Sequence, residues 1–156
     1  MCADVIKVNG VRFFVLIFKI SLFRTTEYCK NGKVDTFMRS IDNIQRLAAR
    51  HGFRVVQFDM DEKLESLQTR TANVLINTVL REEHMPETER NIRTVKDRTR
   101  STLSSLTFQR IKNRILIELA FGQVFCLDTF PNNYGLSSTL SPHTFITGKY
   151  IDHIKH

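Results

Sequence analysis

The sequence predicts an α/β fold, a mixed sheet of antiparallel and parallel strands with helices packed on its faces. Three observations lead to this prediction. The chain opens with strand-like segments around an Asn-Gly turn, its hydrophobic period then becomes helical, and short apolar strands alternate with helices beyond that point. With 156 residues, of which 42% are hydrophobic, the chain suits a single domain with a substantial core.

The first three elements are predicted to be antiparallel strands. Residues 3–18, ADVIKVNGVRFFVLIF, contain two strands on either side of Asn9-Gly10, the dipeptide that best supplies the positive φ angles of a two-residue hairpin turn. Residues 20–28, ISLFRTTEY, suit a third strand, which ends before the Asn31-Gly32 turn. The phenylalanines of this region are expected to be core residues, because alternation buries one face of such a hairpin.

A helix and two further strands are predicted next. From residue 34, apolar side chains recur at helical spacing until Gly52 offers a left-handed stop. They are Val34, Phe37, Met38, Ile41, Ile44, Leu47 and Ala48. Residues 53–58, FRVVQF, suit a buried strand reached by a crossover onto the same sheet. Residues 61–71 suit a short helix, and residues 73–79, NVLINTV, suit one more strand.

Two long helices and an extended tail are predicted to complete the chain. Pro86 suits the first position of the first helix. The apolar stripe of this helix contains Ile92, Val95, Thr99, Leu103 and Leu106. A second helix is expected from about residue 108 to residue 127, and one of its sides contains Ile111, Ile115, Leu119 and Gly122. Residues 131–156 are polar and rich in turn-forming residues, which predicts an extended wrap over the domain.

The charge of the chain indicates the class of its binding partner, and its cysteine content indicates its redox compartment. Lys and Arg number 23 against 16 Asp and Glu, and the net charge of +7 favours a polyanionic partner such as nucleic acid or an anionic membrane surface. Three widely separated cysteines form neither a disulfide framework nor a zinc-ligand spacing, which indicates a reducing compartment. The apolar run at residues 11–23 is interrupted by Lys19 and is too short to span a membrane.

Three acids occupy characteristic places along the predicted elements. Asp4 lies in the first strand, Asp61 just past the strand at 53–58, and Glu89 in the first turns of the helix that Pro86 opens. Glu89 is followed on the same helix by a run of cations, Arg90, Arg93, Lys96 and Arg100. A strand, a strand end and a helix start are the three places that ribonuclease H-like nucleotidyltransferases use for their metal-binding acids, so the chain is similar to that class.

The chain resembles the integrase catalytic core of a Copia-type retrotransposon over nearly its whole length. The resemblance is carried by residues 3–23, 49–67, 82–111 and 135–156, and the block 82–111, in which a glutamate precedes an arginine and opens a basic helix, is the most specific. Three features depart from the family. The spacing of 28 residues from Asp61 to Glu89 is shorter than is typical of these enzymes. Asp61 is followed by Glu62 where a glycine is usual, and the sequence has no histidine and cysteine zinc module ahead of the core.

The resemblance implies a fold, a domain division and a chemistry. The fold would be ribonuclease H-like, with a core at residues 1–130 that is truncated at its start and a C-terminal wrap at 131–156, in a fragment or degenerate copy of the element. If active, the chain would be a DDE-type nucleotidyltransferase that joins element DNA to target DNA. The catalytic residues, which are also the ligands of two divalent ions, Mg²⁺ or Mn²⁺, would be Asp4, Asp61 and Glu89.

Partners and location also follow from the resemblance. DNA would be the partner, and its phosphates would be contacted by Arg90, Arg93, Lys96 and Arg100. No membrane partner is implied, the location would be nuclear or cytoplasmic, and the family allows a homo-oligomer.

Several alternatives stay open at this point. Asp59, two residues before Asp61, lies on the same side of an extended segment and is the other candidate for the second acid. Glu89 also suits the positive end of an ordinary helix, and the basic run suits the solvated face of an amphipathic helix. Two other functions are therefore open: a catalytically inactive nucleic-acid-binding remnant, and a doubly wound signalling or ligand module in which acids near strand ends have another purpose.

Overall fold

The computed structural model describes residues 1–61, 64, 67, 75–79, 86–108, 111–132 and 134–152. The side chains of residues 61, 78–79 and 86–88 lie outside this description. Most of the short helix expected at residues 61–71 also falls outside the described residues.

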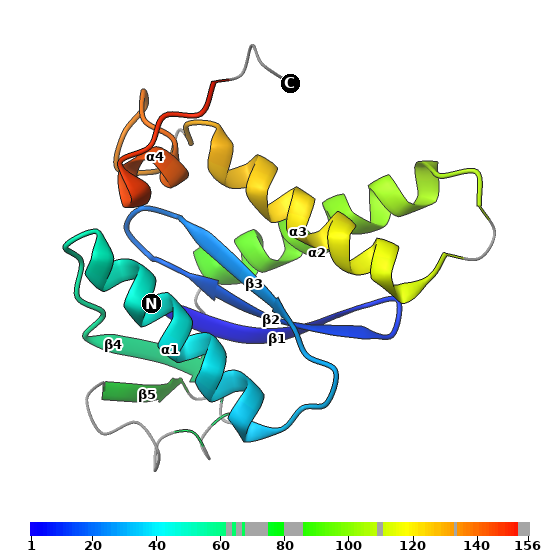
Figure 1. The fold of residues 1–156 in the computed structure, drawn as a ribbon, viewed down its shortest axis with the longest axis horizontal. Coiled ribbons are helices and arrows are strands. Elements are labelled where there is room, and N and C mark those ends of the chain that lie inside the picture. Colours follow the sequence, from blue (N-terminus) through cyan, green and yellow to red (C-terminus); the bar gives the residue numbers. More distant parts are fainter. Residues whose placement is uncertain are drawn as a thin grey trace.

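A five-stranded mixed sheet lies at the centre of the molecule (Figure 1). Its strands are β1 (Cys2–Val8), β2 (Val11–Ile17), β3 (Arg24–Tyr28), β4 (Gln57–Asp61) and β5 (Leu75–Val79). Their spatial order is β3-β2-β1-β4-β5, with antiparallel pairing among the first three and parallel pairing of β4 with β1 and with β5. This arrangement confirms the predicted mixed sheet, in which an antiparallel start is followed by parallel strands.

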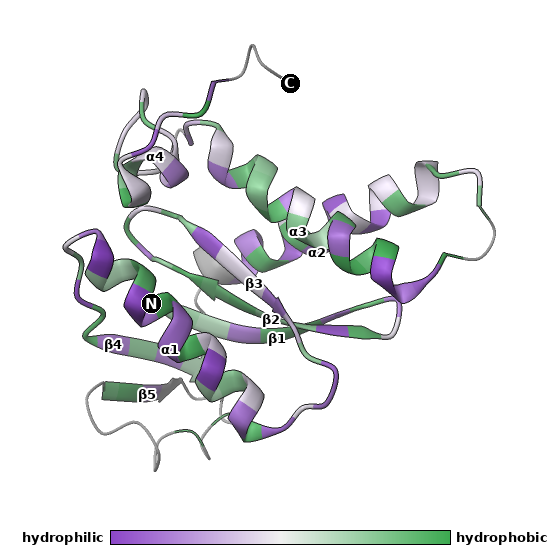
Figure 2. Cartoon of the chain, in the orientation of Figure 1, coloured by the Kyte–Doolittle hydropathy of each residue, from purple (hydrophilic) through white to green (hydrophobic). Residues whose placement is uncertain are grey.

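The hairpin of β1 and β2 fixes the register of the sheet. Asn9 and Gly10 both have positive φ angles, 45° and 86°, as a two-residue turn of this kind requires. Pairing then runs without interruption from Val8↔Val11 to Cys2↔Ile17. β2 is almost wholly buried, and Figure 2 shows hydrophobic residues along β1 and β2.

Helices cover both faces of the sheet and divide the core in two. On one face, α1 (Val34–Arg50) buries Phe37, Ile41 and Ile44 against the sheet, and it ends at His51, before Gly52 with a φ angle of 78°. On the other face lie α2 (Pro86–Ser105) and α3 (Asn113–Thr129), which pack against each other. The α1-side core contains Ala3, Phe14, Leu16, Phe58, Met60 and Ile76 from the strands. The α2-side core contains Ile6, Val8, Phe13, Val15 and Ile17, together with Val95, Leu116, Ala120 and Val124.

Several predicted boundaries differ from the structure. β4 spans Gln57–Asp61, whereas the predicted strand spanned residues 53–58, so Asp61 is the last residue of the strand and does not lie beyond its end. The helix expected from about residue 108 begins at Asn113, because Lys112 is its N-cap with an extended backbone. Its buried side chains include Leu116, Ala120 and Val124, whereas Ile115 and Gly122 of the predicted stripe are exposed.

The sequence predicted an extended C-terminal stretch, but the stretch is not extended throughout. A short helix, α4 (Pro142–Thr147), interrupts it, and the Ser141 side chain caps this helix by accepting the Thr144 N–H at 3.1 Å. Ile146 is buried in the α1-side core, and α4 also contacts α3. The stretch 131–156 therefore joins the main core through α4, and the domain boundary at residue 130 stays a prediction. Among the described helices, none is both long and apolar enough to cross a bilayer.

Candidate functional site

Asp4 lies in the middle of the sheet, on the face that α2 and α3 cover. Side chains alternate along β1, so that Ala3 and Val5 belong to the α1 side, whereas Ile6 and Val8 belong to the other. Asp4 shares the face of Ile6 and is half-buried. Its Oδ1 accepts a hydrogen bond of 2.6 Å from the N–H of Val5. The first predicted acid is therefore on the central strand, at the border between core and surface.

The parallel register of β1 and β4 brings the second predicted acid to the same place. The ladder pairs Cys2 with Asp59 and Ala3 with Met60. One residue further along, this register leads to Asp4 beside Asp61, the last residue of β4. Because Met60 is part of the α1-side core, positions 59 and 61 belong to the opposite face, the face of Asp4.

Asp59, the alternative second acid, has a structural role that uses both of its oxygens. The Lys19 ammonium lies 2.7 Å from its Oδ2, and its Oδ1 accepts hydrogen bonds from Gln57 Nε2 at 2.6 Å and Asn77 Nδ2 at 3.2 Å. Burial by itself would raise the pKa of Asp59, but these three donors together hold that pKa below its usual value. The carboxylate is 95% buried. This set of contacts leaves Asp61 as the better candidate for the second acid.

Glu89 lies near the start of α2, the helix that packs against β1. It is exposed, three residues after Pro86, on the same side of the sheet as Asp4. Among the residues that the structure describes, no three acidic, histidine or cysteine side chains are gathered closely enough to hold a metal ion. The side chain of Asp61 is not among them, so the triad of Asp4, Asp61 and Glu89 stays a prediction. Its donor chemistry fits Mg²⁺ or Mn²⁺, since carboxylate oxygens are the ligands that hard divalent ions prefer.

The cations that follow Glu89 form a stripe along α2. Arg93, Lys96 and Arg100 come four, seven and eleven residues after Glu89, spacings that keep them on one side of a helix. Arg93 and Arg100 are exposed and Lys96 is half-buried. We call Glu89, Arg93, Lys96 and Arg100 the α2 stripe. Arg90 is also exposed, but it lies about 100° around the helix from Glu89. The predicted cations are thus presented to solvent, with Arg90 beside the stripe and not on it.

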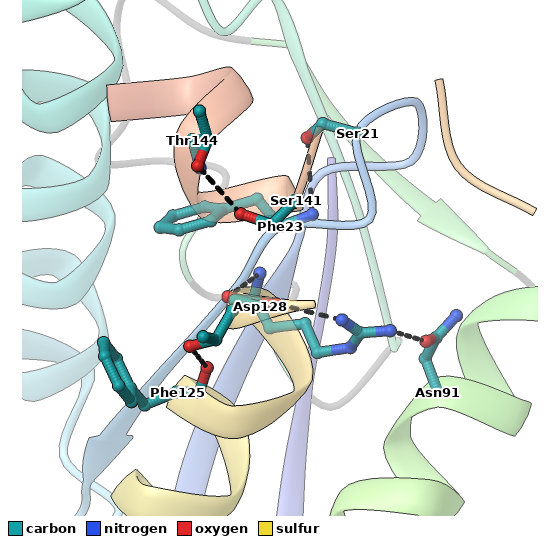
Figure 3. Close-up of polar contacts among 9 residues, drawn as sticks. Ser21, Phe23, Asn91, Phe125, Asp128, Ser141 and Thr144 are labelled. Carbon is teal, nitrogen blue, oxygen red and sulfur yellow. Dashed lines mark hydrogen bonds and ion pairs between the residues drawn. The ribbon is translucent and has the colours of Figure 1, made fainter. Parts of the chain in front are cut away.

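A buried polar clamp fixes the start of α2 against β3 and α3. The Arg24 guanidinium of β3 donates to Asp128 Oδ1 of α3 at 2.9 Å and, through its other end, to the Asn91 amide oxygen of α2. The Arg24 N–H also donates to Asp128 Oδ2 at 2.8 Å. Figure 3 shows Asp128 and Asn91 at the two ends of this network, which we call the α2 clamp. Asn91 is two residues from Glu89, so the clamp sets the position of the candidate third acid.

Burial dominates the electrostatics of the clamp. Arg24 and Asp128 are 3% and 2% exposed. Burial raises the pKa of Asp128 to about 7, against the opposing influence of the Arg24 N–H and guanidinium. Sequence reasoning missed both residues because 104 positions separate them and neither belongs to a recognisable motif.

A largely apolar cleft opens beside the start of β1 and β4. Its volume is about 540 Å³, and its lining includes Phe18, Phe53 and Phe145 with Lys19 and Asp59. Neither Asp4 nor Glu89 is among its described lining residues. Of the candidate acids, the alternative second acid Asp59 therefore lines this cleft, whereas Asp4 and Glu89 do not.

Comparison with known proteins gives a match in structure alone. No family model matches the sequence, and no curated protein matches it significantly. Among solved structures, the chain is similar to the catalytic core domain of BIV integrase in crystal form I. The two share 15% sequence identity with a TM-score of 0.60, over 94% of this chain and 92% of that one. The sheet order, the helices on both faces and this match together show that the chain has the ribonuclease H-like fold of an integrase catalytic core.

Proposed function

We propose that the chain is a metal-dependent integrase core, which cleaves a phosphodiester bond of DNA and joins the resulting end to a target. One observation carries this proposal. The β1–β4 register pairs Cys2 with Asp59 and Ala3 with Met60, and its continuation by one residue would set Asp4 beside position 61 on the side of the sheet where α2 carries Glu89 and three cations on one stripe. The likeness to the BIV integrase core supports it at the level of the fold.

Asp4, Asp61 and Glu89 would hold the metal ions. When bound, Mg²⁺ or Mn²⁺ supplies Lewis-acid activation of the attacking oxygen and stabilises the leaving oxygen. The half-buried setting of Asp4 limits its motion, since the Val5 N–H fixes one carboxylate oxygen. Glu89 sits on a helix whose start is tied to β3 and α3 by the α2 clamp. The chain thus supplies two acids on neighbouring strands and a third on a clamped helix.

The α2 stripe would hold the substrate. Arg93 and Arg100 are exposed, and Lys96 keeps a partly buried stem that fixes where its ammonium emerges. Such cations bind phosphates without reading sequence, and they position a strand next to the acids. Arg90 adds a further cation beside the first turn.

The finer assignment, to a Copia-type retrotransposon, rests on the resemblance of residues 82–111, in which Glu89 precedes Arg90 and opens the basic helix. The same block forms α2 and the start of the connection to α3. A nuclear or cytoplasmic location and assembly into homo-oligomers belong to this proposal as well.

The central experiment measures cleavage of a supercoiled plasmid. Wild-type protein with Mn²⁺ is expected to convert the plasmid to relaxed circles, and EDTA is expected to prevent this. Asp4→Asn should lower the rate by at least about 100-fold, since metal ions contribute several kcal/mol to such reactions. Asp97→Asn, a change at an exposed acid of α2, is the control and should keep the wild-type rate. Nicking that persists in folded Asp4→Asn protein would rule out the proposed mechanism.

A second candidate function is an inactive DNA-binding remnant. It is favoured by one observation: Arg93 and Arg100 of the α2 stripe are exposed, and cations of this kind bind phosphates without any metal site. This candidate predicts DNA binding that weakens with salt, persists in EDTA and is accompanied by no nicking. The plasmid experiment therefore separates the two candidates.

A further inference from the structure

A second hollow lies at the far end of the α2 stripe. Its volume is about 430 Å³, and it is formed by the end of α2, the start of α3 and the turn between β1 and β2. Figure 1 shows that turn next to the start of α3. The lining residues that matter here are Asn9, Arg100, Ser104, Phe108, Asn113 and Leu116.

The chemistry of this hollow is that of a nucleobase site. Phe108 is 69% exposed and offers a flat aromatic face. Leu116, only 4% exposed, supplies an apolar floor. Asn9 and Asn113 each carry an amide that can donate and accept, as the edge of a base does. An aromatic face with amides at its side suits an unpaired base, because bases stack on aromatic rings regardless of sequence.

The position of the hollow places it on the path of a DNA strand that the α2 stripe would hold. Arg100 belongs both to the α2 stripe and to the lining of the hollow. The eleven residues from Glu89 to Arg100 span about 16 Å of helix, which corresponds to roughly five nucleotides of a strand that rises about 3.4 Å per nucleotide. A strand whose phosphates follow the stripe from Glu89 would therefore reach the hollow about five nucleotides from the acids.

We propose that this hollow binds one unpaired nucleobase of the DNA strand that the α2 stripe holds. Phe108 stacks on the base, Asn9 and Asn113 hydrogen-bond its edge, and Arg100 binds the adjoining phosphate. A fully paired duplex offers no such base, so the site selects DNA with a single-stranded extension. The inference rests on the proposed function only in requiring that the stripe binds DNA; it does not require cleavage.

The test compares two fluorescent DNAs, a blunt duplex and the same duplex with an eight-nucleotide extension, by anisotropy titration. Wild-type protein is expected to bind the extended DNA about tenfold more tightly, in line with the contribution of one base stacked on an aromatic ring. Phe108→Ala should remove most of this preference and leave blunt-duplex binding unchanged. Phe130→Ala, a change at another exposed phenylalanine at the end of α3, is the matched control and should keep the preference.

A crosslinking experiment gives an independent readout. With 5-iododeoxyuridine placed in turn at each extension position, ultraviolet light should crosslink one position to Phe108, as identified by mass spectrometry. The site is refuted if the wild type shows no preference for extended DNA, if Phe108→Ala keeps that preference, or if no position crosslinks to Phe108. Failure of the proposed function shows differently: if the stripe does not bind DNA, wild-type protein binds not even the blunt duplex, and if only cleavage is absent, the plasmid experiment shows no nicking while the preference for extended DNA remains.

Discussion

At the scale of single residues, Asp59 and Asp61 show what a strand pattern leaves open. Both lie on β4, two positions apart, so alternation assigns them to the same face and periodicity cannot choose between them. The choice comes from partners elsewhere in the chain, since Lys19 and Asn77 both reach the Asp59 carboxylate. No local signal in the sequence marks Lys19 as the partner of an acid forty positions away.

Asp59→Asn is expected to reduce stability without removing the proposed chemistry. The variant loses a charged acceptor of three donors in a buried place, which should cost about 1 to 3 kcal/mol in the free energy of unfolding. Urea unfolding at pH 7 measures this cost, with Asp97→Asn as the control at an exposed acid. Plasmid nicking per folded molecule should stay near the wild-type rate, in contrast to Asp4→Asn. An Asp59→Asn protein that folds normally and does not nick would identify Asp59 as the second acid after all.

The sign of the pH dependence at Asp59 follows from its lowered pKa. The Asp59 carboxyl binds its proton less tightly in the folded protein than in the unfolded chain. The stability that Asp59 contributes is therefore present above the ordinary pKa of about 4, and it is lost as the pH falls through the pKa of Asp59 in the folded protein. Asp59→Asn should therefore cost less stability at pH 3 than at pH 7.

At the scale of elements, the α2 clamp explains how a helix with so polar a sequence is held in place. α2 buries few side chains, Val95 and Thr99 among them, and it adds the contact of Asn91 with Arg24 at its start. α3 shows the opposite situation. It is apolar on most sides, so the hydrophobic pattern predicted a helix correctly but could not say which side is buried. Contacts with β2, β3 and α2 decide that, and they bury Leu116, Ala120 and Val124.

The stability that Asp128 contributes through the α2 clamp is expected to depend on pH in the opposite direction to that of Asp59. Because the pKa of Asp128 is raised to about 7, the folded state binds its proton more tightly than the unfolded chain. The stability from this group is complete below about pH 4 and is lost as the pH rises to 7, at up to about 1.4 kcal/mol per pH unit. The difference in unfolding free energy between wild type and Asp128→Asn should therefore shrink from pH 5 to pH 7.5. Urea titrations at several pH values measure it, and a difference that grows over this range would contradict the raised pKa.

At the scale of the whole molecule, the sequence predicts the class of fold better than the site. The Asn9-Gly10 turn and the change from strand to helix period at residue 34 are local signals, and they suffice for an antiparallel hairpin followed by a crossover. The strand order depends on β4 pairing with β1 over more than fifty residues, which periodicity does not encode. The α2 clamp and the hollow at Phe108 likewise join segments far apart in the chain. For that reason neither the clamp nor the hollow could be predicted from the sequence.

At the same scale, α2 carries four cations on or beside one stripe, where they could meet a polyanion, and salt dependence tests this directly. If Arg90, Arg93, Lys96 and Arg100 each neutralise one phosphate, a plot of the logarithm of the binding constant against the logarithm of salt concentration should have a slope of roughly −3 to −4. Replacing both Arg93 and Arg100 by Gln should reduce that slope by about 2, because two fewer counterions are released. Arg98→Gln is the control, since Arg98 is exposed on nearly the opposite side of α2 from the stripe. If Arg98→Gln lowers the slope as much per charge as the double variant does, binding reflects net charge and not the stripe, and the path of DNA from Glu89 to Arg100 is wrong.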